Sequence, residues 1–263
     1  MDRLPGNFTF FKDDQGKHIL HIPAKTKIDA CIDLQELLVE LVKSEKVEKL
    51  VIQVQKYAYV KIYDTINSEM QIECIISDGA QLDFFTISAD ENQQVKKDLF
   101  FDLDTNARVN IHGAYMVSDK QKLHIHVAQK HRAQNAQSHL KLYGIVSGDA
   151  SFDFKGSVFV AKEAARSVVS QENKTFIFGN AKIDAIPSME VLNNIDVVCN
   201  HASAVGKIDD RQLLYLQSRG LTDADAKKIL IRGFFDFLIY SFDNRRIKKD
   251  VEKRIKEKMR HIL

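Results

Sequence analysis

The chain has 263 residues, of which 44% are hydrophobic, and its 38 Lys and Arg residues nearly balance 36 Asp and Glu residues. This composition is typical of a folded protein with a sizeable core, and the formal net charge of +2 gives no argument for a nucleic acid partner. Residues 1–16 lack the pattern of a secretion signal, and no apolar run is long enough to cross a bilayer. Three cysteines without CxxC spacing indicate a reducing compartment. We therefore expect a cytoplasmic protein that does not bind membranes.

Residues 1–45 form an N-terminal segment that mixes strand and helix patterns. Two short strands are predicted at residues 8–11 (FTFF) and 18–22 (HILHI). An apolar helical pattern follows in DLQELLVELVKSEK.

Residues 46–208 consist of short alternating runs such as KLVIQVQ, MQIECIIS and KLHIHVA, which predict strands. Small or turn-forming residues recur just before a new strand in SDGA, TNA, SGDA and GNA, which end at Ala80, Ala107, Ala150 and Ala181. Many short strands would also suit a sandwich or a barrel. The recurrent corner favours a β-solenoid, in which each coil stacks on the previous one.

The pattern becomes helical in residues 209–263, which predict a C-terminal helical domain. The first helix is expected to start at the Asp pair 209–210 and to end at Gly220. Thr222 and Asp225 have the spacing of a capping box and predict the start of a second helix.

The last helical segment, RRIKKDVEKRIKEKMRHIL, is strongly basic and carries apolar residues at three- or four-residue steps. Residues 245–260 contain nine Lys or Arg against three acidic residues, a local charge of +6. The pattern is typical of an amphipathic helix that packs by its apolar stripe. A docking surface for an acidic partner stays open as an alternative, whereas membrane binding is least supported because no aromatic residues flank the stripe.

The stretch VVCNHASAVG places Cys199 two residues before His201, so alternation puts both side chains on one side of an extended segment. This pattern fits either a piece of apolar core or half of a metal site. A lone cysteine in such a setting is most often a small buried hydrophobe.

A second group of histidines includes two on one strand face in the sequence HIH. Its members are His124, His126, His131 and His139. No acidic or thiol residue completes a set of ligands at fixed spacing, so we expect these side chains to be exposed or stacked in ladders. Nothing in the pattern supports a structural zinc ion.

Signatures of enzymes are absent from the sequence. It contains no GxxxxGK[ST] phosphate loop, no GxSxG elbow and no HExxH motif. A carbohydrate-active β-helix would need clustered acidic residues on one strand face, and the sequence has no such set. We therefore predict a protein that is not an enzyme and has no catalytic residue.

Residues 180–235, NAKIDAIPSMEVLNNIDVVCNHASAVGKIDDRQLLYLQSRGLTDADAKKILIRGFF, resemble the C-terminal signature of the SufB/SufD family of iron–sulfur cluster assembly scaffolds. In that family an A-x(n)-P-x-L-E-I strand leads to D-V-K-C-S-H-G-A-T-V-G, then to I-D-x-E-Q-L-F-Y-L-x-S-R-G-I and a helix ending in G-F. The order, spacing and chemistry agree over this whole stretch. The resemblance implies a right-handed parallel β-helix followed by a small helical domain.

Within that family the chain is more similar to SufD than to SufB. The strand ENKTFIFGN lacks the Cys expected of SufB, and Ala202, rather than Glu, follows His201. SufD proteins usually carry a longer N-terminal extension, so the chain resembles a reduced core of the family. A minimal system in which one SufBD-type subunit pairs with itself stays open.

The resemblance implies a SufD-like scaffold that pairs with a SufB-type subunit. His201 would lie at their interface and hold, together with a SufB thiolate, a transient iron–sulfur cluster that is not stably bound in the isolated chain. Neutral imidazole is a good iron ligand, and Cys199 is the weaker candidate. A solenoid that only binds proteins, with His201 merely packed, is the alternative.

The resemblance also implies that an ABC-type ATPase, SufC, docks on helices expected at 209–219 and 223–241. Arg211, Tyr215 and Arg219 are the candidate contacts on the first of these helices. Capping of the open end of the solenoid is the other interpretation of these helices, and the two roles are compatible.

Overall fold

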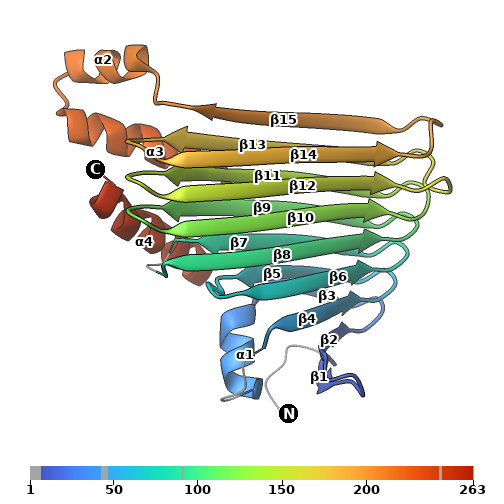
Figure 1. Cartoon of the computed structure of the whole chain (residues 1–263). Helices are drawn as coiled ribbons and strands as arrows, with labels where there is room; N and C mark the ends of the chain where they lie inside the picture. The colour runs from blue at the N-terminus through green and yellow to red at the C-terminus, as the bar shows by residue number, and fades with distance from the viewer. Residues whose placement is uncertain (1–6, 43–46, 90–91, 243–244, 263) are drawn as a thin grey trace.

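The structure, a computed structural model, describes residues 7–42, 47–89, 92–242 and 245–262. Two β-sheets face each other, and the chain passes from one sheet to the other between consecutive strands (Figure 1). Neighbouring strands within each sheet run parallel, except that β1 (Thr9–Lys12) pairs antiparallel with β2 (His18–Ile22). The result is a β-solenoid of about six turns, as the repeated corners predicted.

The strands alternate between the two sheets along the chain. After β1 and β2, the first sheet continues with β4 (Lys49–Val54), β6 (Met70–Ile76), β8 (Gln94–Leu103), β10 (Lys122–His131), β12 (Ser151–Val160) and β14 (Lys182–Val191). The second sheet contains β3 (Lys27–Asp33), β5 (Tyr59–Asp64), β7 (Gln81–Ser88), β9 (Arg108–Val117), β11 (Gln137–Val146), β13 (Val168–Ile177) and β15 (Val198–Gly206). Helix α1 (Leu34–Val42) follows β3 and confirms the helical pattern seen near the N-terminus.

Side chains that point into the coil stack on equivalent side chains of the next coil. Leu123 in β10 lies in register with Val95 in β8 and with Phe152 in β12, and all three are buried. The alternating pattern of each strand therefore fills one continuous interior, because successive residues of a strand point to opposite faces.

The turns between strands repeat a single residue in the left-handed conformation. From the first sheet to the second, these residues are Lys25, Tyr57, Gly79, Asn106, Asn135, Arg166 and Asp196. Except for Asp196 in the last coil, their backbone N–H groups donate to the next coil: Asn106 donates to the Gln134 carbonyl at 3.0 Å and Asn135 to the Ala165 carbonyl at 2.9 Å. The turns thus form a hydrogen-bonded ladder that fixes how each coil lies on its neighbour.

The alanine corners that the sequence singled out belong to both edges of the solenoid. Ala80 and Ala107 lie where the chain passes to the second sheet, whereas Ala150 and Ala181 lie where it returns to the first. Ala80, Ala107 and Ala150 have no exposed surface. Alanine corners therefore occur at both edges of the solenoid and are not confined to one edge.

One ion pair is buried inside the solenoid. The Lys97 Nζ lies 2.8 Å from Asp64 Oδ2, and the Thr86 hydroxyl donates to the same oxygen at 2.8 Å. The other Asp64 oxygen accepts the backbone N–H of Ile66 at 2.9 Å. The two charged side chains are at most 1% exposed, so each compensates the charge of the other in a medium where water cannot.

Replacing Lys97 with Met should lower the free energy of unfolding by about 3–5 kcal/mol, because the Asp64 carboxylate would stay buried without its counter-charge. The double variant Lys97→Met/Asp64→Leu should lose less than either single variant. Urea unfolding of each protein measures these differences.

The neighbouring Lys96 is the matched control. Its Nζ lies at the surface, 3.4 Å from Asp98 and 3.7 Å from Glu69. Lys96→Met should change the free energy of unfolding by about 1 kcal/mol or less. Equal losses for Lys96→Met and Lys97→Met would show that the buried ion pair contributes no more to the free energy of unfolding than a surface ion pair does.

Three helices follow the solenoid: α2 (Asp210–Ser218), α3 (Asp223–Tyr240) and α4 (Arg245–Ile262). Asp209 is the N-cap of α2 and accepts the backbone N–H of Arg211, while Thr222 is the N-cap of α3 and accepts that of Asp225. Both caps are as predicted. The chain turns between the two helices at Gly220, whose φ of 92° suits glycine.

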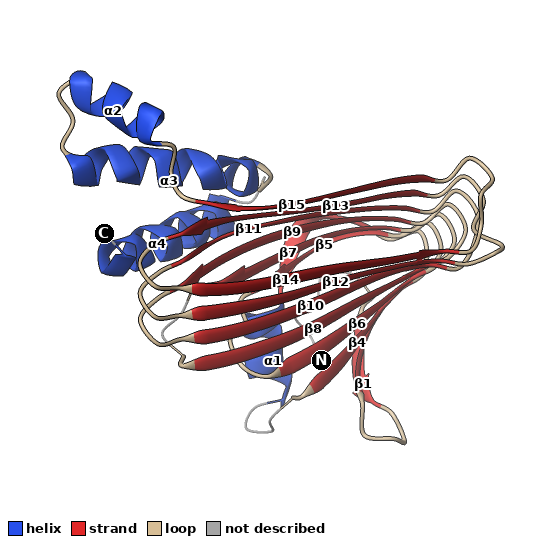
Figure 2. Cartoon of the chain, turned by 45° about the horizontal axis from the view of Figure 1, so that its top comes forward, coloured by secondary structure: helices blue, strands red, loops and turns tan. Residues whose placement is uncertain are grey.

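Helices α3 and α4 lie against the outer face of the second sheet (Figure 2). The ring centroids of Tyr143 and Phe237 are 4.2 Å apart, and those of Phe176 and Phe234 are 4.3 Å apart. The apolar stripe of α4, which includes Val251 and is buried in the same cluster, confirms the predicted amphipathic helix. These helices cover one side of the solenoid, which differs from the alternative that they cap its end.

Candidate functional site at the last coil

The last coil, formed by β14 and β15, has no neighbour on one side among the described residues. β14 pairs only with β12, and β15 pairs only with β13. Large apolar side chains on and between these strands are between 41% and 57% exposed: Ile186, Met189, Val191, Leu192, Ile195, Val198 and Val205. Both sheets thus end in a long, open strand with apolar side chains, a combination that folded proteins normally cover.

Strand register places Cys199 and His201 on the inner side of this last coil. Cys199 lies in register with Val169 and His201 with Gln171, and both partners on β13 are buried inside the solenoid. The expectation that the two side chains share one side of the strand is confirmed. His201 is nonetheless exposed, because no coil stacks on β15.

The two candidate ligands differ in their surroundings. Cys199 packs against a small apolar cluster that includes Val160 and Val169, and burial raises the pKa of its thiol. The thiol is therefore protonated at neutral pH unless a metal ion displaces the proton. His201 has no hydrogen-bond or ion-pair partner within the described part of the chain and is free to contact another molecule.

The last coil by itself is an incomplete metal site. The described residues contain no group of three or more His, Cys, Asp or Glu side chains that could hold a metal ion. One imidazole and one neighbouring thiol leave most of the coordination positions of an iron ion open. A metal ion or cluster bound here would need ligands from a second molecule.

Beneath the last coil the interior is polar, which sequence patterns had not indicated. Gln171 donates to Gln129 at 2.7 Å, Gln129 donates to the Ser138 hydroxyl at 2.7 Å, and the same hydroxyl lies 2.7 Å from His131 Nε2. The alternation in KLHIHVAQKH already assigns positions 129 and 131 to the inner side, a signal that could have identified these residues. The network holds Gln171 in place directly below His201.

The prediction for the histidine group is wrong for one member. His131 has no exposed surface and points into the solenoid, although it was expected to be exposed or stacked in a ladder. His126 and His139 are half-buried on outer faces and confirm that expectation. The His126 ring lies 5.3 Å from that of Phe100, and His139 Nδ1 lies 2.8 Å from the Ser170 hydroxyl. His124 is likewise half-buried.

The candidate contacts on α2 are exposed, as expected. No residue of α2 is buried, and Leu214 and Tyr215 are 67% and 60% exposed. The Arg219 guanidinium lies 5.8 Å from the centre of the Tyr215 ring. Arg211 occupies the first turn of the same helix.

No helix among the described residues is long and apolar enough to cross a membrane.

The fold and the last coil define a β-solenoid with one open end and helices along one side. The family model described as "SUF system FeS cluster assembly, SufBD core domain" matches residues 76–234. That span is more than half of the chain and contains the whole last coil. The chain belongs to the SufBD core domain family of the SUF iron–sulfur cluster assembly system.

Several relatives share part of this region. An iron–sulfur cluster assembly SufBD family protein of Mycobacterium leprae is 31% identical over 135 residues, which cover 48% of this chain and 34% of the relative. SufD of Escherichia coli is 33% identical over 116 residues, covering 44% and 27%. SufD of Bacillus subtilis is 27% identical over 131 residues, covering 49% and 30%. The matched region spans about a third or less of these curated relatives.

One buried and one half-buried histidine should make stability depend on pH. Burial lowers the pKa of His131 to about 4 and that of His112, which stacks on Phe85, also to about 4. In the unfolded chain a histidine binds a proton near pH 6.5, so the unfolded state gains protons first as the pH falls. The free energy of unfolding should decrease between about pH 6.5 and pH 4. Urea unfolding should show a smaller decrease for His131→Gln and for His112→Gln. A decrease as steep as that of the wild type in both variants would contradict the assignment of this pH dependence to His131 and His112.

Proposed function

We propose that the protein is a SufD-like, noncatalytic scaffold subunit of a SUF-type assembly complex. The observation that carries this proposal is the open last coil, which exposes His201 but supplies too few ligands for a metal ion. The membership of the SufBD core domain family supports it, because that family acts in cluster assembly. In this proposal the iron–sulfur cluster is the cargo of the complex and not a resident cofactor.

The partner at the last coil is proposed to be a SufB-type subunit. An open edge strand can add a strand from a second chain by backbone hydrogen bonds, and exposed apolar residues such as Met189 and Val205 gain burial from the same contact. SufB-type chains resemble this chain in fold, so their last coil would offer a matching pair of edges. A second copy of this chain could pair by the same edges, which is the alternative of a self-pairing scaffold.

The chemistry of the interface follows from the ligands that each side can offer. The exposed imidazole of His201 can ligate iron in its neutral form, while the SufB-type partner would contribute a thiolate. Mixed imidazole and thiolate ligation leaves a cluster less negative than four thiolates do and favours its transfer. Cys199 is a secondary candidate, because its half-buried thiol would have to lose a proton first.

Replacing His201 with Ala should lower the yield of assembled cluster severalfold when the protein is reconstituted with SufB-type and SufC-type partners, iron and a sulfur donor. The yield is measured by the visible absorbance and the iron content of the purified complex. His201→Cys, which restores a ligand, should recover part of the yield. His124→Ala, a change on the outer face of the first sheet, serves as the control and should leave the yield unchanged.

The same reconstitution separates the alternatives. Yields that are equal for wild type and His201→Ala would reject the metal role and favour a solenoid that only binds proteins. Sedimentation of the protein alone and mixed with the SufB-type chain shows whether it pairs with itself or with the partner. A self-paired protein that assembles cluster without the SufB-type chain would reject the heterodimer.

A SufC-type ABC ATPase is proposed to dock on α2. The chain has no phosphate-binding loop of its own, so energy from ATP must come from another subunit. No residue of α2 is buried, and the helix presents Tyr215 with Arg219 beside it and Arg211 one turn earlier, residue types that dominate protein interfaces. The three free cysteines fit a reducing compartment, and we place the complex in the cytoplasm.

Reversing the charge of both arginines in Arg211→Glu/Arg219→Glu should weaken binding of the SufC-type ATPase at least about tenfold, because interface arginines often contribute 2 kcal/mol or more. Calorimetric titration measures the affinity. The double variant Lys122→Glu/Lys155→Glu, on the outer face of the first sheet, makes the same change in net charge and should bind normally. Equal affinity of both variants would contradict the α2 site. Deletion of the helices is a poorer test, because it would also uncover the second sheet.

A further inference from the structure

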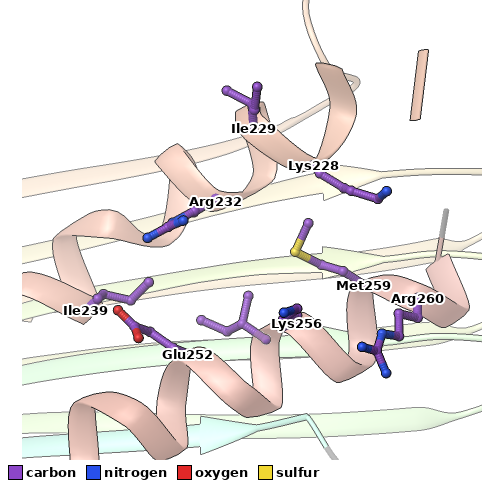
Figure 3. A pocket seen from close by; sticks show the side chains of 9 residues that line it. Lys228, Ile229, Arg232, Ile239, Glu252, Lys256, Met259 and Arg260 are labelled. Atoms are coloured by element: carbon purple, nitrogen blue, oxygen red, sulfur yellow. The ribbon is translucent and has the colours of Figure 1, made fainter. Parts of the chain in front are cut away.

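A groove of about 540 Å³ runs between α3 and α4. Figure 3 shows side chains of both helices around it, with Arg232 on α3 and Lys256 and Arg260 on α4. The lining on α3 extends from Lys228 to Ile239. At 1.5 Å per residue, this stretch of helix is about 17 Å long.

The floor of the groove is apolar. Ile239 and Ile255 are each 3% exposed and Met259 is 8% exposed, so their side chains lie at the bottom of the groove and do not project from the molecule. Ile229 is 49% exposed and adds an apolar wall on α3. The methionine gives the floor a side chain that adapts to different apolar groups.

The rim of the groove is basic. Lys228, Arg232, Lys256 and Arg260 line it, against a single acidic residue, Glu252. Lys228 already pairs with Asp225 at 3.0 Å. The other three cations have no ion pair within the described part of the chain. A ligand with acidic groups at its edges could therefore form ion pairs with Arg232, Lys256 and Arg260.

We propose that the groove binds an acidic amphipathic helix of a partner protein. A third helix laid between two others buries an apolar face in the groove, and its carboxylates would meet the basic rim. The groove accommodates about eleven residues of such a helix, as its length implies. The groove residues lie on α3 and α4, whereas the contacts proposed for the SufC-type ATPase, Arg211, Tyr215 and Arg219, lie on or directly after α2.

Other anionic occupants fit the groove less well. A membrane surface binds apolar side chains that project outward, whereas here Ile239 and Ile255 lie recessed between two helices. A small anion such as phosphate would leave the apolar floor uncovered. Only a ligand with both an apolar face and acidic edges matches floor and rim together.

The test uses synthetic fluorescent peptides and the full chain. One 18-residue peptide carries Leu at helical spacing flanked by Glu; a second carries Lys in place of Glu; a third is a scrambled version of the first. Fluorescence anisotropy should detect binding of the first peptide only, and added salt should weaken it. Equal binding of the basic or the scrambled peptide would overturn the proposal. Binding of the chain to anionic phospholipid vesicles without binding of the acidic peptide would also overturn it.

Variants locate the site. Lys256→Glu/Arg260→Glu should raise the dissociation constant of the acidic peptide by about tenfold or more, since two charge contacts become repulsive. The control Lys122→Glu/Lys155→Glu has the same change in net charge and should stay within about twofold of the wild type. Circular dichroism and urea unfolding verify that both variants are folded. Equal effects of the two double variants would overturn the groove as the binding site.

Discussion

The structure depends on the in-register hydrogen bonding of each coil to the next. Parallel strands give every coil two rows of backbone donors and acceptors, and the turn residues add a third, as in the bonds from Asn106 and Asn135 to the coil that follows. Each coil therefore completes the one before it and needs one after it. The interior obeys the same constraint, because side chains such as Leu123 are covered by their equivalents above and below.

No further coil stacks on the last coil, and the candidate functional site lies there. β15 has a partner on one side only, so the inner side chain of His201 is exposed where an equivalent residue one coil earlier, Gln171, is 2% exposed. The same position in the fold thus provides a buried hydrogen bond in one coil and an accessible imidazole in the next. In the proposed complex, the last coil of a second solenoid would complete the hydrogen bonding, the apolar burial and the ligand set together.

The helices relate to the solenoid differently. They do not continue the stack but cover the outer face of the second sheet, where aromatic pairs such as Tyr143 and Phe237 fix α3 in place. This arrangement leaves the last coil open, places α2 away from the sheet and creates the groove between α3 and α4. One chain thereby presents three separate surfaces, and each has a distinct chemistry: open strand edges, an exposed helix with arginines, and a basic groove with an apolar floor.

Local features of this protein follow from the sequence by itself. Alternation identifies the strands and puts Cys199 and His201 on one side, and the caps at Asp209 and Thr222 define where two helices begin, because these properties depend on residues a few positions apart. The tertiary structure alone decided which residues meet across coils. Asp64 and Lys97 pair over a separation of 33 residues. Such contacts depend on the number of residues in each coil and on which side of the sheet the helices cover, and no local pattern encodes either.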